Sequence, residues 1–409
     1  MDKIKIGLIR EGKVPPDKRV PLSPKQARQL MDTFPQAEVL VQSSKIRCFP
    51  DEEYLAEGIQ VKENLEECDI LMGVKEVPVQ DLIPNKTYLF FSHTFKKQPY
   101  NAKLLKALLE KKIRLVDYEV LKYPDGKRII GFGRYAGIAG CYSGFRAFGL
   151  KNQCYELKAG WQCKDAAELH EELKKVKLPA DTKIVLTGHG RVGGGAREIL
   201  ASLNLKEVSP QDFLTNTYTE PVFTHLSSEQ CFRRKSDGAY DKEEFYKNPG
   251  VYESVFPKFA ATAHMYVACH FWAQGAPFYF TMDDVKSPDW KINTVADISC
   301  DVGGPVGSTI EASTIEEPYY GFHRFESRKC DMMDKDAICV MAVDNLPCEI
   351  PRDASVGFGR DLMEKVLPLL IEGDRDKIIE NACETNLSGQ LTPKFAYLEE
   401  YAMGKIESH

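Results

Sequence analysis

Two groups of residues in this chain have types and spacings that could do chemistry. The first is the stretch Lys183 to Leu203, KIVLTGHGRVGGGAREILASL, in which Gly188, Gly190 and Gly193 follow the pattern G-x-G-x-x-G. A turn without side chains lets the backbone approach a pyrophosphate, and the helix after it offers unpaired N–H groups and its positive dipole end. Because a β-type run precedes the turn and a helix-forming run follows it, the stretch predicts dinucleotide binding.

The second group lies in the first half of the chain, where three strand-like runs end in ionisable residues. ILMGVK ends at Lys75, YLFFSH at His93 and RLVDYE at Glu119. Open parallel sheets bind ligands outside the carboxyl ends of their strands, so these side chains are expected to meet at one site. A lysine and a histidine suit acid–base work near neutral pH, and Glu76 beside Lys75 could tune its pKa. For Glu119 alone, an ordinary solvated loop is an equally good interpretation.

Two further clusters contain residue types that can bind a ligand. The loop after His93 carries Lys96, Lys97 and Gln98 and is therefore suited to a substrate with a carboxylate. The segment AHMYVACH contains histidines and a cysteine, but no carboxylate is interleaved and the segment reads as a buried helix. No metal site is expected, because the ligand pattern of one is missing.

These residues must be positioned by alternating strands and helices. The patterns predict strands at 4–9, 39–41, 69–74, 88–91 and 114–118, with helices from about Ser23 to Phe34, at 51–57 and at 101–112. Such alternation is typical of parallel pairing in an α/β domain. Later strands are expected at 183–186, 295–298 and 338–343, and an amphipathic helix at 352–371 is expected to close the protein. Residues 211–290 give few regular signals.

Residues 205–208 are expected to form the second strand of the nucleotide-binding fold. Glu207 lies about twenty residues beyond Gly188, where an acid commonly holds the ribose of the dinucleotide. Ser209, which precedes Pro210, could instead be the residue at the strand end, and a serine there would leave space for a 2′-phosphate. The residues therefore leave NAD and NADP both open.

The bulk composition limits the classes of function. The chain has 409 residues, enough for two or three domains, with 43% hydrophobic and 28% charged residues. A net charge of −6 with intermixed signs argues against a nucleic-acid partner, and no apolar run approaches the length of a membrane span. The start of the chain lacks the apolar core of a signal peptide, and the twelve cysteines form no C-x-x-C pair. We expect a cytoplasmic protein with reduced thiols and small-molecule substrates; the oligomeric state, a homo-oligomer included, stays open.

A set of short motifs, specific in their number, order and spacing, resembles the saccharopine dehydrogenase family. The likeness includes the lysine–2-oxoglutarate reductase branch and, more distantly, alanine dehydrogenase. It covers nearly the whole chain. The motifs are GLIRE…KRVPLSP (7–24), GVKEVP (73–78), FFSHTFKKQ (90–98), RLVDYE (114–119), FGRYAG (132–137), TGHGRVGGGA (187–196), ADISCDVGG (296–304) and VDNLP (343–347).

The resemblance implies an oxidoreductase that interconverts saccharopine with L-lysine and 2-oxoglutarate through an imine, using NAD or NADP. It implies that Lys75 and His93 form the acid–base pair. The implied substrate-binding residues are Arg19, Glu76, Lys96, Gln98, Glu119, Phe132, Ser299, Cys300 and Asp301. The implied cofactor-binding residues, taken with those from the glycine pattern, are Gly188, Gly190, Arg191, Val192, Gly193, Glu207, Ser209, Ile298, Val343, Asp344, Asn345 and Leu346.

The resemblance also implies two Rossmann-like, doubly wound α/β domains with a cleft between them. Residues 1–140 and 325–409 would form the catalytic domain, and 141–324 the dinucleotide-binding domain. Two alternatives stay open: an amino-acid dehydrogenase that acts on a smaller substrate such as alanine, and an NAD(P)-binding regulator without turnover.

Some residues depart from the family pattern. Family members that use NAD carry an aspartate at the end of the second strand, where this chain offers Val208 or Ser209. Val192 replaces a cysteine of one branch, so no redox switch is inferred there. The segment FRRKSDGAYD resembles the reductase branch, which leans towards NADPH, whereas Lys75-Glu76 resembles the dehydrogenase branch.

Overall fold

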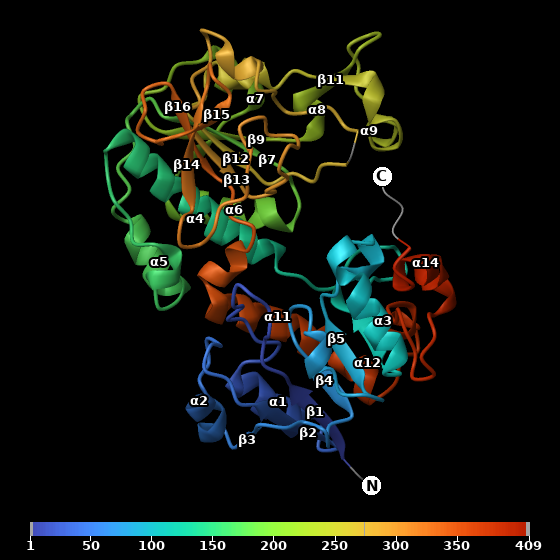
Figure 1. Ribbon diagram of the computed structural model, residues 1–409. Coiled ribbons are helices and arrows are strands. Elements are labelled where there is room, and N and C mark those ends of the chain that lie inside the picture. Colours follow the sequence, from blue (N-terminus) through green and yellow to red (C-terminus); the bar gives the residue numbers. More distant parts are fainter. Residues whose placement is uncertain (1–2, 274, 406–409) are drawn as a thin grey trace. The chain divides into compact units, whose positions relative to one another are not determined.

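The structure is a computed structural model that describes residues 3–273 and 275–405. The chain divides into two compact units. Unit 1 combines the residues up to Phe132 with those from Pro351 onwards, and unit 2 runs from Gly133 to Ile350. Both are α/β units built on largely parallel sheets, which confirms the predicted fold class (Figure 1). Within the described residues, no helix is long and apolar enough to cross a membrane.

Unit 1 contains a parallel sheet of six strands in the order β3-β2-β1-β4-β5-β6. The order reverses between β1 and β4, which is the switch point typical of doubly wound folds. Every predicted strand of this unit is present, and β3 is an addition that the sequence patterns did not predict. The strands are β1 (Ile4–Leu8), β2 (Ala37–Gln42), β3 (Gln60–Lys62), β4 (Ile70–Met72), β5 (Thr87–Phe90) and β6 (Arg114–Asp117).

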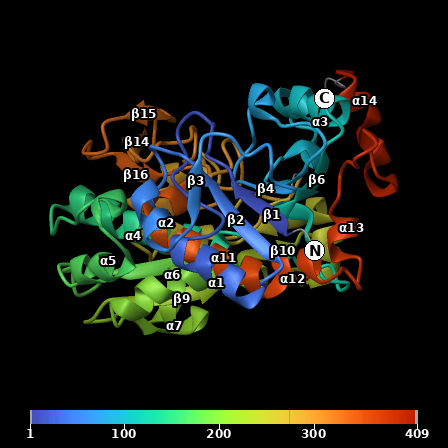
Figure 2. The ribbon, with the colours of Figure 1, turned by 90° about the horizontal axis from the view of Figure 1, so that it is seen from below.

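The helices of unit 1 come from both ends of the chain. Helix α1 begins as predicted, because Ser23 and Gln26 form a capping box and Pro24 occupies the first turn. Helices α1 and α11 contact each other although more than 300 residues separate them (Figure 2). The helices are α1 (Pro24–Thr33), α2 (Asp51–Ala56), α3 (Ala102–Glu110), α11 (Pro351–Lys365), α12 (Leu367–Ile371), α13 (Ile378–Asn381) and α14 (Glu399–Ala402).

The single closing helix predicted at 352–371 is wrong in two respects. It is broken at Val366, between α11 and α12, where Pro368 removes a backbone donor and its ring crowds the preceding turn. It is also followed by further elements, up to α14. One of them brings Cys383 beside Val116 of β6, so the end of the chain supports the edge of this sheet.

Unit 2 contains an eight-stranded sheet in the order β15-β14-β16-β13-β12-β7-β9-β8. The six strands from β16 to β8 are parallel, and β14 and β15 are antiparallel additions at one edge. The strands are β7 (Lys183–Thr187), β8 (Lys206–Glu207), β9 (Val222–Leu226), β12 (Met265–Ala268), β13 (Thr294–Asp297), β14 (Tyr319–His323), β15 (Arg328–Cys330) and β16 (Ala337–Met341).

Two helices of unit 2 pack unusually closely. A Cβ added at Gly137 of α4 (Gly133–Asn152) would lie 1.9 Å from the carbonyl oxygen of Val192. A Cβ added at Gly195 of α6 (Arg191–Ser202) would lie 1.9 Å from the carbonyl oxygen of Arg134. The many glycines of both segments are thus explained by the close contact between the two helices.

The remaining α-helices and β-strands of unit 2 are α5 (Ala166–Leu173), α7 (Pro210–Thr215), α8 (Ser228–Cys231), β10 (Phe232–Arg234), α9 (Lys242–Lys247), β11 (Tyr252–Ser254) and α10 (Pro257–Ala260).

The units differ from the predicted domains at both boundaries, which lie at 132/133 and 350/351 instead of 140/141 and 324/325. At the first boundary, α4 is one continuous helix that packs against β13 and β16. At the second, β14, β15 and β16 pair with the sheet of unit 2. The prediction of a buried helix for the AHMYVACH segment is wrong, because the segment contains the buried strand β12. A short apolar run has the same appearance in a buried helix and in a buried strand, so the sequence pattern could not distinguish them.

Candidate functional site

The carboxyl ends of β4, β5 and β6 bring three of the candidate residues of unit 1 together. These strands are neighbours and parallel, so the residues that follow them share one edge of the sheet. His93 Nδ1 lies 2.6 Å from Glu76 Oε1, and His93 Nε2 lies 3.9 Å from Glu119 Oε2. The imidazole therefore sits between two carboxylates, each from a different strand end.

The turn that carries His93 is held by two buried carboxyl groups. His93 itself has a left-handed backbone, with φ of 56°. On one side of it, the Ser92 amide donates to Asp117 Oδ2 at 2.9 Å, and on the other the Thr94 hydroxyl donates to Glu384 Oε2 at 2.5 Å. Burial raises the pKa of both Asp117 and Glu384, so the two acids favour sharing protons over carrying two charges.

The two carboxylates beside His93 differ in their surroundings. Burial by itself would raise the pKa of Glu76, but its hydrogen bond with His93 and the nearby Lys13 ammonium bring that pKa to about 2. An ionised Glu76 accepts a hydrogen bond from the Nδ1–H group of His93, so the lone pair of the neutral imidazole is at Nε2. Glu119 Oε1 is paired with Lys96 Nζ at 2.7 Å, whereas its Oε2 is buried and has no hydrogen-bond partner in the described residues.

Lys75 lies directly after β4 and is held through its backbone. The buried carboxyl group of Glu11 accepts hydrogen bonds from the amide N–H of Val74 at 2.6 Å and from that of Lys75 at 2.9 Å. Burial lowers the pKa of the Lys75 ammonium, and the positive charges of Arg19 and Lys13 lower it further. The folded structure therefore brings the pKa of Lys75 closer to neutral pH, where a lysine can accept and donate protons.

Arg19 and Phe132, both predicted to touch substrate, lie next to each other. The Arg19 guanidinium carbon is 4.2 Å from the centre of the Phe132 ring, which stacks on Phe358 at 4.4 Å. Arg19 is only 3% exposed and donates to both carboxylate oxygens of Asp17, at 3.0 and 2.6 Å. Two of its nitrogens are thus already engaged, so its role towards a substrate carboxylate stays a prediction.

Gln98, the remaining candidate in unit 1, is anchored by aromatic hydroxyls. Its side-chain oxygen accepts from Tyr100, and its backbone carbonyl accepts from Tyr401 of α14 at 2.5 Å. These contacts fix the end of the basic loop.

In unit 2, each glycine of the G-x-G-x-x-G pattern has a distinct structural reason. Gly188 has φ of 91°, and a Cβ there would lie 2.4 Å from the carbonyl oxygen of Cys269. A Cβ on Gly193 would lie 1.9 Å from the carbonyl oxygen of Gly188, whereas one on Gly190 would meet open space. The turn is therefore tight on its inner side and open at Gly190, just before α6 begins, as a pyrophosphate requires.

Glu207 does not face this open side. Its carboxylate forms a bidentate ion pair with Arg197, at 2.9 and 2.8 Å. Arg197 Nη1 lies 3.1 Å from His225 Nδ1, and His225 Nε2 lies 2.7 Å from the Gly188 carbonyl oxygen. Burial lowers the pKa of His225, so a neutral ring accepts from Arg197 and donates to Gly188. Glu207 is thus linked to the turn at Gly188 through Arg197 and His225.

The strand order separates Glu207 and Ser209 from the strand that lies beside the turn, so their contact with the ribose stays a prediction. The second strand along the chain, β8, is the outer strand, and β9 lies directly beside β7. Ser209 caps α7 by accepting the Asp212 amide at 3.0 Å. The residues after β9, from Ser227 to Glu229, take the place next to the turn. The run VFTHL followed by two serines was the signal that could have revealed this strand.

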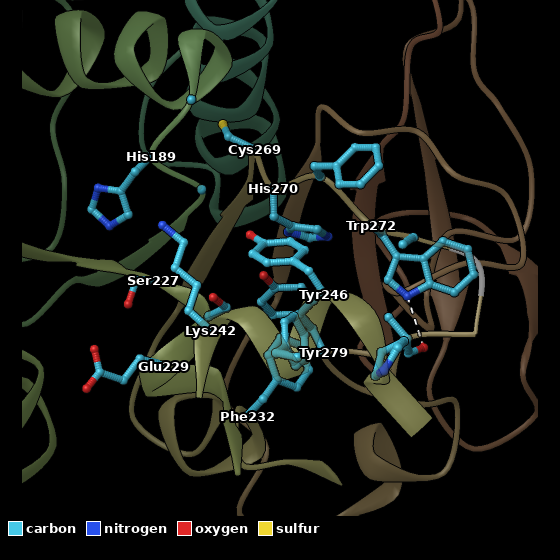
Figure 3. Close-up of a pocket in the computed structure, with 18 of the residues that line it drawn as sticks. His189, Ser227, Glu229, Phe232, Lys242, Tyr246, Cys269, His270, Trp272 and Tyr279 are labelled. Carbon is cyan, nitrogen blue, oxygen red and sulfur yellow. Dashed lines mark hydrogen bonds between the residues drawn. The ribbon is translucent and has the colours of Figure 1, made fainter. Parts of the chain in front are cut away.

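A cavity of about 1010 Å³ opens beside the glycine-rich turn (Figure 3). The turn and the first residues of α6, including Arg191 and Val192, line one side of it. The segments after β9 and β12 line the other side and contribute several aromatic rings. Sequence reasoning missed all of these rings, because they come from the stretch 211–290.

The other candidates of unit 2 do not line this cavity. Ser299 donates to the buried carboxylate of Asp297 at 2.5 Å, Cys300 donates its amide to the same oxygen at 3.2 Å and its thiol to Ala342, and Asp301 is exposed. Asp297 thereby fixes the loop after β13. Of the predicted cofactor contacts here, Ile298, Val343 and Leu346 are buried, Asp344 is exposed and Asn345 is half-buried.

Comparisons with known proteins agree with this architecture. Residues 7–139 match the family model for the N-terminal domain of alanine dehydrogenase and PNT. The structure resembles an L-alanine dehydrogenase with a TM-score of 0.65 and 16% identity, covering 97% of this chain and 99% of the other. This likeness shows the fold.

Sequence relatives extend along almost the whole chain. It is 30% identical to the mitochondrial α-aminoadipic semialdehyde synthase of Rattus norvegicus, over 94% of this chain and 46% of the relative. It is 24% identical to the saccharopine dehydrogenase [NAD(+), L-lysine-forming] of Yarrowia lipolytica, over 90% of this chain and 92% of that protein. The chain thus spans about half the length of its synthase relatives. These likenesses confirm the resemblance that the sequence motifs indicated.

Proposed function

We propose that this chain, which is similar in sequence to saccharopine dehydrogenases and to α-aminoadipic semialdehyde synthases, interconverts saccharopine with L-lysine and 2-oxoglutarate. The proposed reaction joins the lysine ε-nitrogen to C2 of 2-oxoglutarate as an imine, with loss of water. A bound NADH or NADPH would supply the hydride that reduces that carbon, and NAD or NADP would accept a hydride in the reverse direction.

The observation that carries this proposal is the placement of His93 between Glu76 and Glu119, with Lys75 directly before Glu76 in the chain. Imine formation requires one group that removes a proton from an ammonium and another that protonates a leaving hydroxyl. A lysine with a lowered pKa can remove the first proton, and a histidine whose lone pair is at Nε2 can take up the second proton and pass it to the hydroxyl. The unpartnered, buried Oε2 of Glu119 supports the proposal further, because a substrate ammonium would satisfy it.

In the direction of saccharopine formation, we assign the proton transfers as follows. Neutral Lys75 accepts a proton from the ε-ammonium of the substrate lysine, which frees the amine to attack the keto carbon. His93 Nε2 then accepts the proton that the nitrogen loses after it has added to the keto carbon, and Glu76 stabilises the imidazolium that forms. The imidazolium returns this proton to the hydroxyl group, which leaves as water. Arg19, Gln98 and the loop 299–301 stay candidates for holding the substrate.

The residues of unit 2 fit a dinucleotide. The turn at Gly188 to Gly190 and the beginning of α6 would hold the pyrophosphate, and the neighbouring cavity would receive the rest of one half of the molecule. The nicotinamide supplies hydride transfer when bound. Protein side chains would only bind it, orient it and exclude water.

The test is a comparison of initial rates, followed by nicotinamide absorbance, with two substrate pairs. Lysine plus 2-oxoglutarate should oxidise the reduced cofactor, and pyruvate plus ammonia should not. Running both with NADH and NADPH also decides the cofactor. Turnover with the second pair alone would identify an alanine-type dehydrogenase, and cofactor binding without turnover of either pair would identify a regulator.

A further inference from the structure

The loop that carries His93, residues 92–98, has a backbone that needs support from outside the loop. His93 and Lys97 both have φ of 56°, a left-handed conformation that residues other than glycine seldom adopt. The short turn Thr94–Lys96 lies between them. Such a backbone persists only where surrounding contacts hold it. The contacts to this loop therefore decide where the imidazole of His93 lies.

Most of that support comes from the C-terminal segment, residues 383–401, in which Glu384 binds both the sheet and the loop. The Glu384 amide donates to the carbonyl oxygen of Leu115 in β6 at 2.9 Å, and its carboxyl group accepts from the Thr94 hydroxyl at 2.5 Å. Glu384 and Thr94 are both fully buried, so water does not compete for this bond. The segment is thus anchored to the sheet of unit 1 directly beside the loop.

Two tyrosines of the same segment bind the loop further along. The Tyr397 hydroxyl donates to the carbonyl oxygen of Phe95 at 2.9 Å, and the Tyr401 hydroxyl donates to that of Gln98 at 2.5 Å. Tyr401 belongs to α14, which packs against α3, the helix that follows the loop (Figure 1). Because both acceptors are backbone carbonyls, these bonds hold the path of the loop itself.

The path of the loop determines the contacts of the imidazole. His93 Nδ1 lies 2.6 Å from Glu76 Oε1, and Nε2 lies 3.9 Å from Glu119 Oε2. The two carboxylates follow other strands, so they would not move together with the loop. A shift of the loop by about 1 Å would carry Nδ1 out of hydrogen-bond range of Glu76.

We propose that Tyr397 and Tyr401 are positioning residues for His93. They act through the backbone of the loop 92–98, which they hold in the one conformation that keeps the imidazole between Glu76 and Glu119. The effect on turnover rests on the role of His93 in the proposed function, whereas the effect on the geometry of the imidazole does not.

Rates of the full chain test the proposal with a variant that removes only two hydroxyl groups. Tyr397→Phe combined with Tyr401→Phe keeps both rings and should lower kcat with lysine and 2-oxoglutarate about tenfold, because the rate falls steeply when a catalytic group is misplaced. The KM of the reduced cofactor should stay unchanged. Tyr123→Phe, at an exposed tyrosine outside the loop, is the control and should match the parent chain.

The same two changes in a His93→Gln chain separate positioning from a general structural effect. Because the hydroxyls act through His93, they should lower the remaining kcat no further in that chain. An equal loss of kcat with and without His93, or no loss in the parent background, overturns the proposal.

The imidazole itself gives a readout that needs no substrate. With isotopically labelled histidine, the Nδ1 proton in the short bond to Glu76 should give a far-downfield nuclear magnetic resonance that His93→Gln removes. The double tyrosine variant should shift or broaden this resonance, and Tyr123→Phe should not. If the parent chain lacks the resonance, or the double variant leaves it unchanged, the proposal is overturned. If the resonance changes as expected but the parent chain does not turn over lysine with 2-oxoglutarate, the proposed function fails and the positioning of His93 stands.

Discussion

The residues near His93 have pKa values suited to acid–base catalysis because neighbouring strands place other charged groups beside them. Glu76 is adjacent to Lys75 in sequence, yet its hydrogen bond is to His93, 17 residues away. Glu11, a residue with no obvious role in the sequence, holds the Lys75 backbone. Burial, together with the charge of Asp17, raises the pKa of Glu11 to about 8, so the site contains one more proton-holding group than the motifs suggest.

Removing either member of the proposed acid–base pair should slow turnover without abolishing folding. We expect His93→Gln and Lys75→Met each to lower kcat by about 10²–10⁴-fold, the usual contribution of general acid–base catalysis. Steady-state rates with saturating lysine and 2-oxoglutarate measure this. Lys103→Met, on the exposed face of α3, and His170→Gln are matched controls that should keep full activity. Parent-like rates in both site variants would remove the assignment.

Arg19 should matter for stability whether or not it also touches substrate. Arg19→Ala removes both side-chain hydrogen bonds that the buried Asp17 carboxylate, which is 1% exposed, accepts from the guanidinium. Breaking a buried ion pair costs about 3–5 kcal/mol of unfolding free energy. The exposed pair of Arg28 with Asp32 is the control, and Arg28→Ala should cost about 0.5 kcal/mol or less. Urea unfolding of both variants decides, and equal losses would contradict the account.

At the scale of elements, the contact between α4 and α6 positions the glycine-rich turn. Two adjacent glycines of α6 make this testable. A Cβ at Gly195 would meet the Arg134 carbonyl oxygen, whereas one at Gly194 would meet nothing within 4 Å.

We therefore expect Gly195→Ala to destabilise unit 2 by about 1–3 kcal/mol, because backbone must move to admit the methyl group. Gly194→Ala should instead be neutral or stabilise by up to about 1 kcal/mol, the helix-propensity difference. Thermal unfolding of the pair measures this. Similar melting temperatures for the two variants would show that the close helix contact is not required.

The turn after β5 depends on the buried acids Asp117 and Glu384. Because the folded chain raises the pKa of Glu384 from 4.5 to about 8, it binds more protons than the unfolded chain between these values. The stabilisation is complete below about pH 4.5 and is lost as the pH rises towards 8.

Glu384→Gln keeps the shape of the protonated acid and cannot ionise. Its unfolding free energy should therefore fall less than that of the parent chain between pH 5.5 and pH 8 in denaturant titrations. Glu399→Gln, an exposed change at the start of α14, should leave the pH dependence unaltered. A parent-like slope in Glu384→Gln would mean that the acid is already ionised in the fold.

At the scale of the whole molecule, the sequence predicted the α/β class, the strands of unit 1 and the convergence of three strand ends. Strict apolar runs and clear caps such as Ser23-Pro24 made these elements readable. The sequence could not predict that β9 lies between β7 and β8 in the sheet, because strand order depends on long-range pairing and β8 has only two residues. It also could not show Glu207 turned away from the ligand side by Arg197, or the loop 92–98 held by Tyr397, since both follow from tertiary contacts.

In the proposed reaction, a hydride is added to C2 of 2-oxoglutarate after lysine has condensed there. Mass spectrometry of the product formed with NADH or NADPH deuterated at the transferring position tests this most directly. The account predicts saccharopine with one deuterium, at the carbon derived from C2 of 2-oxoglutarate. Cofactor oxidation that leaves lysine and 2-oxoglutarate unjoined, or saccharopine without deuterium, would contradict it.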